Sequence, residues 1–204
     1  MWSIKYAPKT IEDCILTPEH KKLFSSFIQK GAIPNLLLVG DPGLGKTTIA
    51  KILSDACEFE CYEVNASLDA GLDKLRTEFV GFASSVSMFG RGKVILFDEA
   101  DYIRRPSQAA LRGMIDKFSG GCSFILTANY EKKLLDPIKS RLHVIRFGTD
   151  GASSDKMKTA MVKRIRQIAK SEGVRFNSKL VKDAVNDNFP DLRSVINAAE
   201  LALA

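Results

Sequence analysis

The feature that most constrains the fold is a glycine-rich segment that lies between a short apolar run and a helical pattern. Residues 36–39 are all apolar, as in strands that are buried on both faces of a parallel sheet. Residues 40–48 read Gly-Asp-Pro-Gly-Leu-Gly-Lys-Thr-Thr and match the phosphate-binding pattern Gly-x-x-x-x-Gly-Lys-Thr. A helix with Ile49, Ile52 and Leu53 on its apolar face is expected to follow. This order of strand, loop and helix predicts an α/β domain.

The residue types of this segment suit the binding of a nucleoside triphosphate. Glycines allow backbone N–H groups to curl around a phosphate without Cβ clashes, and the helix N-terminus adds a partial positive charge. Lys46 is predicted to reach the β- and γ-phosphates, and the Thr47 hydroxyl is predicted to bind Mg²⁺. A chance glycine-rich turn is the alternative, and the flanking strand and helix argue against it. The predicted phosphate-binding residues are Gly40, Asp41, Pro42, Gly43, Leu44, Gly45, Lys46, Thr47 and Thr48.

Two neighbouring acids form the second motif. Asp98 and Glu99 follow the apolar run 94–97, so they are predicted to lie at the carboxyl end of a buried strand, where parallel α/β sheets bind ligands. Asp98 is assigned to Mg²⁺ through water, and Glu99 is assigned as the general base that polarises the attacking water. A strand that simply ends in solvated acids is the alternative interpretation.

Strand and helix patterns alternate through the first three quarters of the chain. Strands are predicted at residues 36–39, 61–65, 94–97, 122–126 and 143–147, with helices between them. This alternation predicts a five-stranded, mostly parallel sheet. Residues 148–154 have the composition of a linker, and only helical patterns follow. We therefore expect an α/β domain at residues 1–150 and a small all-helical domain at residues 151–204.

The composition is that of an ordinary globular protein, with 45% hydrophobic residues and a net charge of +6. A modest basic excess fits a nucleic-acid partner, although a well-solvated surface is the alternative. The cysteines lack the spacing of a zinc site, so we expect reduced thiols. Neither a signal peptide nor an apolar run long enough to span a membrane is found, which predicts a cytoplasmic protein with no membrane partner. A viral replication complex in the host cytoplasm, or a nucleus, would also be compatible.

The two motifs together resemble those of the AAA+ ATPases, because the phosphate-binding segment is followed by Phe-Asp-Glu-Ala-Asp at residues 97–101. Residues 124–129 resemble the sensor 1 strand of that family, which implies that Asn129 orients the attacking water or contacts the γ-phosphate. The resemblance implies an enzyme that hydrolyses ATP to ADP and phosphate, with Mg²⁺ as its metal ion. It also implies that the helical domain is an AAA+ lid.

Five further segments resemble the sliding-clamp-loader branch of this family. They are the N-terminal box at residues 2–10, Asn-Ala-Ser at 65–67, residues 107–112, Ser-Arg at 140–141 and Phe-Pro-Asp-Leu-Arg at 189–193. Over nearly its whole length the chain resembles replication factor C small subunits and the large subunits of T4-like phage clamp loaders. This resemblance implies a subunit that uses ATP to open a sliding clamp and place it on primer–template DNA during replication, in a ring or spiral with other loader subunits.

The resemblance also implies roles for residues outside the two motifs. Arg141 would be a finger that acts on a neighbouring subunit's ATP, and Arg193 would contact phosphate from the lid. Tyr6, Pro8 and Ile15 would lie near the adenine, with simple N-terminal anchoring as the alternative for Tyr6 and Pro8.

Further roles concern the surface. Lys74, Arg76 and Arg112 would contact DNA phosphates, with a solvated helix face as the alternative. Met88 and Phe89 would enter a groove of the sliding clamp, unless they pack on the core.

The sequence departs from the family pattern at Ala7, in place of an arginine, and at Leu142, in place of a cysteine. The family's C-terminal collar domain is also expected to be lacking in these 204 residues. Two functional alternatives remain at this point. One is another AAA+ DNA motor, such as a branch-migration helicase or an initiator ATPase, and the other is a structural clamp-loader subunit that never hydrolyses ATP.

Overall fold

The computed structural model describes residues 1–66, 72–85, 87, 90–148 and 151–204, and within these ranges the side chains other than those of 72–77 and 151–152. One five-stranded sheet forms the centre of the larger part. Its strands are β1 (Leu36–Gly40), β2 (Glu60–Asn65), β3 (Lys93–Asp98), β4 (Ser123–Ala128) and β5 (His143–Phe147). They pair in the order β2-β3-β4-β1-β5, and each pairing is parallel. The predicted five-stranded sheet is therefore confirmed.

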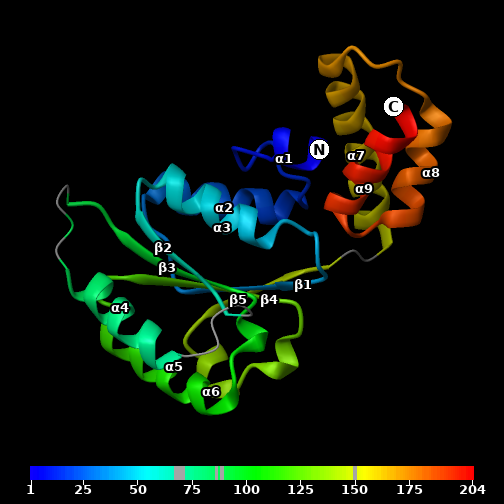
Figure 1. Ribbon diagram of the computed structural model, residues 1–204. Coiled ribbons are helices and arrows are strands. Elements are labelled where there is room, and N and C mark those ends of the chain that lie inside the picture. The colour runs from blue at the N-terminus through cyan, green and yellow to red at the C-terminus, as the bar shows by residue number, and fades with distance from the viewer. Residues whose placement is uncertain (67–71, 86, 88–89, 149–150) are drawn as a thin grey trace.

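Helices cover both faces of this sheet (Figure 1). Helices α2 (Pro18–Lys30) and α3 (Lys46–Ala56) lie on one face, and α4 (Leu72–Ser84), α5 (Arg105–Phe118) and α6 (Asp136–Lys139) lie on the other. Two short 3₁₀ turns, η1 (Ala100–Tyr102) and η2 (Glu131–Lys133), follow β3 and β4. Successive residues of β1 alternate between two cores, because Leu36 and Leu38 pack with Phe24 while Leu37 packs with Phe97. This two-sided burial is the reason why the strand reads as a continuous apolar run.

Local signals account for the bounds of α2. The Thr17 hydroxyl accepts a hydrogen bond from the backbone N–H of His20 at 3.3 Å, and Pro18 occupies the first helical position. Gly31 ends the helix with φ of 58°, in the left-handed region. Both ends of the helix are therefore explained by local sequence signals.

The expected lid, in the described part of the chain, consists of the helices α7 (Gly151–Glu172), α8 (Ser178–Asn188) and α9 (Leu192–Leu203). Their shared core includes Met161, Ile165, Val181 and Val195. The predicted linker at 148–154 is too long, because the helical backbone of α7 already begins at Gly151. Small and hydroxylated residues suit the first turn of a helix as well as they suit a linker, so composition does not separate the two.

The N-terminal segment packs on the lid. Helix α1 (Trp2–Lys5) lies beside α9, where the Trp2 side chain is buried against Ile168 and Ala169. The backbone N–H of Trp2 donates to Glu200 Oε2 at 2.7 Å. The first residues of the chain therefore join the two expected domains, and the boundary at residue 150 stays a prediction. In the described part of the chain, no helix has the length and apolar character needed to cross a membrane.

Candidate nucleotide-binding and catalytic site

The predicted phosphate-binding segment connects the end of β1 to the start of α3. Gly43 has φ of 77°, and a Cβ atom added to it would lie 1.8 Å from Asp191 Oδ1 at the start of α9. Glycine is therefore required at this position for two reasons, the left-handed backbone and the close approach of the lid. The lid thus contacts the phosphate-binding loop directly.

Lys46 connects this loop to the end of β4. Its side chain is buried, with the residue 7% exposed, and Nζ donates to Gly40 O at 2.8 Å and to Asp41 O at 2.9 Å. A third hydrogen bond runs from Lys46 Nζ to Asn129 Oδ1 at 2.8 Å. Burial lowers the pKa of Lys46, and nearby carboxylates, with Asp98 the largest contributor, oppose that shift. The structure therefore brings together two of the predicted catalytic residues, which are 83 positions apart in sequence.

A second pair of predicted residues meets beside them. The Thr47 hydroxyl donates to Asp98 Oδ1 at 2.6 Å, and so does the hydroxyl of Thr127, also at 2.6 Å. The oxygens of Thr47 and Asp98, 2.6 Å apart, are of the hard type that Mg²⁺ prefers as ligands. Mg²⁺ uses few protein ligands and fills its remaining positions with phosphate oxygens and water. Among the described residues, no group of three or more His, Cys, Asp or Glu side chains could hold a metal ion alone. The residues present thus suit a magnesium ion that arrives with a nucleotide.

Glu99 is held in an unusual backbone conformation at the carboxyl edge of the sheet. Its φ is 56°, in the left-handed region that non-glycine residues rarely adopt. Its backbone N–H donates to Thr127 Oγ1 at 3.0 Å, so Thr127 fixes both acids of the second motif. A backbone of this kind costs about 1 kcal/mol or more, and such costs gather at functional sites. Thr127 was not predicted as a site residue, because a threonine inside a strand is ordinary.

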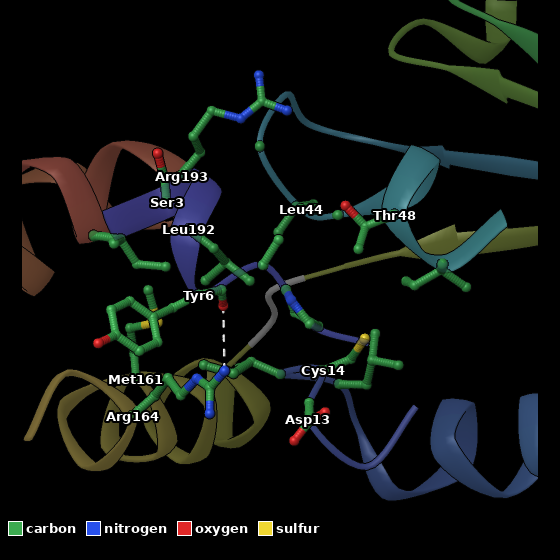
Figure 2. Close-up of a pocket in the computed structure, with 18 of the residues that line it drawn as sticks. Ser3, Tyr6, Asp13, Cys14, Leu44, Thr48, Met161, Arg164, Leu192 and Arg193 are labelled. Carbon is green, nitrogen blue, oxygen red and sulfur yellow. Dashed lines mark hydrogen bonds between the residues drawn. The ribbon is translucent and has the colours of Figure 1, made fainter. Parts of the chain in front are cut away.

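A cavity of about 540 Å³ lies between the sheet domain and the lid (Figure 2). The N-terminal segment, the turn before α2, the phosphate-binding loop, α3, α7 and α9 all contribute to its wall. Several of the predicted nucleotide-site residues line it. They are Tyr6, Pro8, Ile15, Gly43, Leu44, Gly45, Thr48 and Arg193. The predicted adenine and lid residues thus share one cavity with part of the phosphate-binding loop.

Arg164 of α7 also lines this cavity and was missed by the sequence interpretation. Its Nη2 donates to Tyr6 O at 3.2 Å, the hydrogen bond that is dashed in Figure 2. Arg164 lies three residues after Met161, so helical spacing puts both on neighbouring positions of one face. The sequence offers no distinctive signal for this role, because an arginine is an ordinary residue on a partly exposed helix.

Arg141 follows α6 and lies apart from this cavity. It forms a short ion pair with Asp116 of α5, and its Nη1 donates to Pro137 O at 2.6 Å. The hydrogen bond between the two side chains raises the pKa of Arg141 and lowers the pKa of Asp116. Among the described residues, Arg141 is not part of the wall that surrounds the predicted adenine site.

Of the residues predicted to contact DNA or the sliding clamp, the structure describes only the side chain of Arg112. Arg112 is exposed on α5. Lys74 and Arg76 lie within α4, with side chains outside the described part, and Met88 and Phe89 lie outside the described residues altogether. These five assignments stay predictions.

Known protein families match both parts of the chain. Residues 36–149 match the ATPase family associated with various cellular activities (AAA), and residues 153–201 match the AAA+ ATPase lid domain of the sliding-clamp-loader large subunit. The sliding-clamp-loader large subunit of Enterobacteria phage T4 is 40% identical over 203 residues, which cover 94% of this chain and 61% of that protein. The replication factor C small subunit of Methanocella arvoryzae is 33% identical over 208 residues, which cover 99% of this chain and 63% of that protein.

Solved structures show the same fold. The RuvB Holliday junction branch migration motor of Thermotoga maritima superposes with a TM-score of 0.75 at 19% identity, covering 95% of this chain and 63% of that one. At that identity the likeness concerns the fold alone. This chain spans about three fifths of the length of the curated relatives named above. From the family match, the parallel sheet and the phosphate-binding loop with its lid, we conclude that the chain belongs to the AAA family of ATPases and carries a lid domain of the clamp-loader type.

Proposed function

We propose that this chain is the ATP-hydrolysing part of a sliding-clamp loader, which opens a clamp and places it on primer–template DNA during replication. The observation that carries the proposal is the meeting of Lys46 with Asn129, and of Thr47 with Asp98, beside a cavity lined by the lid. The similarity to clamp-loader and replication factor C subunits supports the choice of assembly.

The cavity suits the adenosine part of ATP. Tyr6, Pro8 and Ile15 give it an apolar wall on the N-terminal side, and Leu44 contributes from the phosphate-binding loop. The triphosphate would then lie along the loop towards Lys46. Arg193, in the first turn of α9, is poorly placed for the helix dipole unless an anion lies nearby, and phosphate supplies that anion.

The proposed reaction is the attack of a water molecule on the γ-phosphorus, with cleavage of the bond to the bridging oxygen, giving ADP and phosphate. Glu99 takes the proton of that water as general base, and the Asn129 amide orients the water or the γ-phosphate. Lys46 stabilises the charge on the phosphate oxygens. Thr47 and Asp98 would hold Mg²⁺, which neutralises phosphate charge when it is bound.

We assign Arg141 to a neighbouring subunit's site. It lies outside the cavity of its own chain and pairs with Asp116 near α6. A guanidinium stabilises the charge that develops during phosphoryl transfer, and a finger supplied in trans makes turnover depend on assembly.

The remaining roles concern the partners. Lys74, Arg76 and Arg112 would follow the phosphates of the template without reading its sequence. Met88 and Phe89 would dock in a groove of the sliding clamp, where Met and aromatic side chains supply adaptable contact area.

The test is ATP turnover by the full-length protein assembled with its partner subunits, measured with and without primer–template DNA and sliding clamp. We expect strong stimulation that needs both ligands. The matched blank is Glu99→Gln, which should retain ATP affinity and lose turnover because only the base is removed. ATP binding without turnover in every assembly would contradict the proposal and indicate a structural subunit. Processive DNA unwinding would instead indicate another motor.

A further inference from the structure

We infer that Asp101 is a positioning residue of the ATPase site, that it holds Asn129 in place on Lys46, and that Lys133 on the surface is its counter-ion. The inference rests on the proposed ATPase function. Asp101 belongs to η1, three residues after Asp98, and none of the roles assigned above uses it.

The Asp101 carboxylate is fully removed from solvent. The residue is 4% exposed and its side chain is 0% exposed. A buried carboxylate is costly unless hydrogen bonds or a cation compensate it, so its contacts need an explanation.

One carboxylate oxygen supports the residue that touches the phosphate-binding lysine. Asp101 Oδ1 accepts a hydrogen bond from the backbone N–H of Asn129 at 3.2 Å, directly after β4 ends. The side chain of the same Asn129 accepts the hydrogen bond from Lys46 Nζ at 2.8 Å. Asp101 thus fixes the backbone from which the catalytic amide projects. Burial lowers the pKa of Lys46, and the negative charge of Asp101 opposes that shift, second to Asp98 among the carboxylates.

The other carboxylate oxygen lies near the ammonium group of Lys133. Asp101 Oδ2 has no hydrogen-bond partner in the described part of the chain, and Lys133 Nζ lies 3.8 Å from it. That distance is too long for a hydrogen bond but suits an ion pair. The Lys133 side chain is 49% exposed, so the pair joins the buried site to the surface.

Lys133 is itself held between two tyrosine rings. Its Nζ lies 4.9 Å from the ring centroid of Tyr102 and 4.7 Å from that of Tyr130, at distances typical of cation–π contacts. Tyr102 follows Asp101 in sequence, and Tyr130 follows Asn129. The two rings around Lys133 therefore come from the same two segments as the hydrogen bond between Asp101 and Asn129. The Lys133 carbonyl also accepts a hydrogen bond from Gln108 Nε2 at 3.0 Å, and Gln108 is only 1% exposed. Both the backbone and the ammonium group of Lys133 are therefore fixed.

A purely structural tie between η1 and η2 is the competing explanation, and kinetics separates the two. If Asp101 only stabilises the fold, its loss should weaken ATP binding, turnover and the protection of β4 together. If it positions Asn129, turnover should fall while ATP affinity remains, because the amide acts on the transferring phosphate.

The experiment compares Asp101→Ala, Asp101→Asn and Lys133→Met with the wild-type protein, and uses Lys132→Met as the matched control. Lys132 is exposed on the same turn, and among the described residues the ion pair of Asp101 is with Lys133 and not with Lys132. Three quantities are measured: kcat and KM for ATP in the assembled loader, the Kd of a fluorescent ATP analogue, and amide hydrogen exchange of residues 125–129 in the isolated chain.

For Asp101→Ala we expect kcat to fall about 10- to 100-fold, the usual effect of removing a partner that orients a catalytic group. The Kd should change by less than about threefold, as for an interaction made mainly in the transition state. Exchange at the Asn129 amide should rise while that of Ile125 and Leu126 stays unchanged. Asp101→Asn retains an acceptor, so its kcat should lie between those of Asp101→Ala and the wild type. Lys133→Met should lower kcat, as Asp101→Ala does, and Lys132→Met should have no effect on kcat.

The inference is overturned if Asn129 exchange and kcat in Asp101→Ala equal those of the wild type, or if ATP affinity (a rise in Kd) and β4 protection are lost in parallel with kcat. Should Asp101→Ala fail to fold, Asp101→Asn and Lys133→Met carry the same test. A wild-type protein that never turns over ATP would contradict the proposed function, whereas hydrogen exchange at Asn129 would still decide on Asp101.

Discussion

Replacing Gly43 with alanine should strain the contact between the phosphate-binding loop and the lid. The new Cβ would lie 1.8 Å from Asp191 Oδ1, 2.3 Å from Asp191 Cγ and 3.0 Å from Asp191 Cα, so a side-chain rotation alone cannot relieve the clash. The backbone φ of 77° adds a second cost, because an alanine pays about 1 kcal/mol in the left-handed region.

The group that must move is the N-cap of α9. Asp191 Oδ1 accepts from the backbone N–H groups of Arg193 and Ser194, each at 3.0 Å, and Oδ2 accepts from the Ser194 hydroxyl at 2.8 Å. Loss of such a cap costs about 1 kcal/mol. Together with the backbone cost this gives about 2 kcal/mol, which corresponds to a decrease in Tm of roughly 4–8 °C for a chain of this size. If the lid swings away to relieve the clash, the same energy weakens ATP binding about 30-fold.

Two other glycines separate these costs. Gly31→Ala has a positive φ of 58° and open space at the Cβ position, so it reports the backbone cost alone. Gly113→Ala, in α5, has neither a positive φ nor a close neighbour, and it should raise Tm because alanine is the better helix former. Differential scanning fluorimetry gives Tm, and titration with a fluorescent ATP analogue gives Kd. The reasoning is refuted if Gly43→Ala matches Gly31→Ala in Tm and binds ATP within about threefold of the wild type.

Three further outcomes follow from the structure. Trp2→Ala should lower Tm, because the truncation of a large core side chain costs about 3 kcal/mol or more. It should also weaken ATP binding in the same titration, because the buried indole holds the N-terminal segment that brings Tyr6 to the cavity. Unchanged ATP affinity would show that the N-terminal segment does not contribute to the site. Arg141→Ala should leave Tm nearly unchanged, because the ion pair with Asp116 is exposed, while turnover in the assembled loader falls; an equal loss of turnover in an isolated monomer would rule out a role in trans. Burial raises the pKa of the Cys122 thiol to about 11, so at pH 8 on the order of one thiol in a thousand is the reactive thiolate. Mass spectrometry after brief iodoacetamide treatment of the native protein should therefore find Cys122 unmodified.

The sequence predicts the parts of this site whose signals are local. The apolar run of β1 and the glycine spacing that follows it place Lys46 without any knowledge of tertiary structure. The meeting of Lys46 and Asn129 also follows from a general rule, since parallel strands bring their carboxyl ends to one edge of the sheet. The order of strands adds the detail that β1 and β4 are neighbours, with Val39 beside Ala128. Asn129, the next residue after Ala128, therefore reaches the loop that begins at Gly40.

Other residues of the site carry no distinctive local pattern. Thr127 fits a strand and Arg164 fits the polar side of a helix, so each matches its secondary structure whether or not it has a role. The packing of Trp2 on Ile168 joins segments that are far apart in sequence, and no periodicity extends across such a distance. For residues 151–154 the linker interpretation was wrong because alanine and serine occur both in loops and in the first turn of a helix.

The architecture makes the cavity sensitive to the position of the lid. The lid touches the rest of the chain at the phosphate-binding loop through Asp191 and at the N-terminal segment, where Arg164 donates to Tyr6 O and the Tyr6 hydroxyl donates to Glu172. Each of these contacts borders the cavity or involves a residue that lines it. A nucleotide that fills the cavity would contact both parts at once, so its binding energy would favour one arrangement of the lid over others. Because Arg193 and the cap residue Asp191 are two positions apart, any movement of α9 that brings the guanidinium to a phosphate must also change the contact at Gly43. We therefore expect the lid position and the phosphate contacts to change together and not independently.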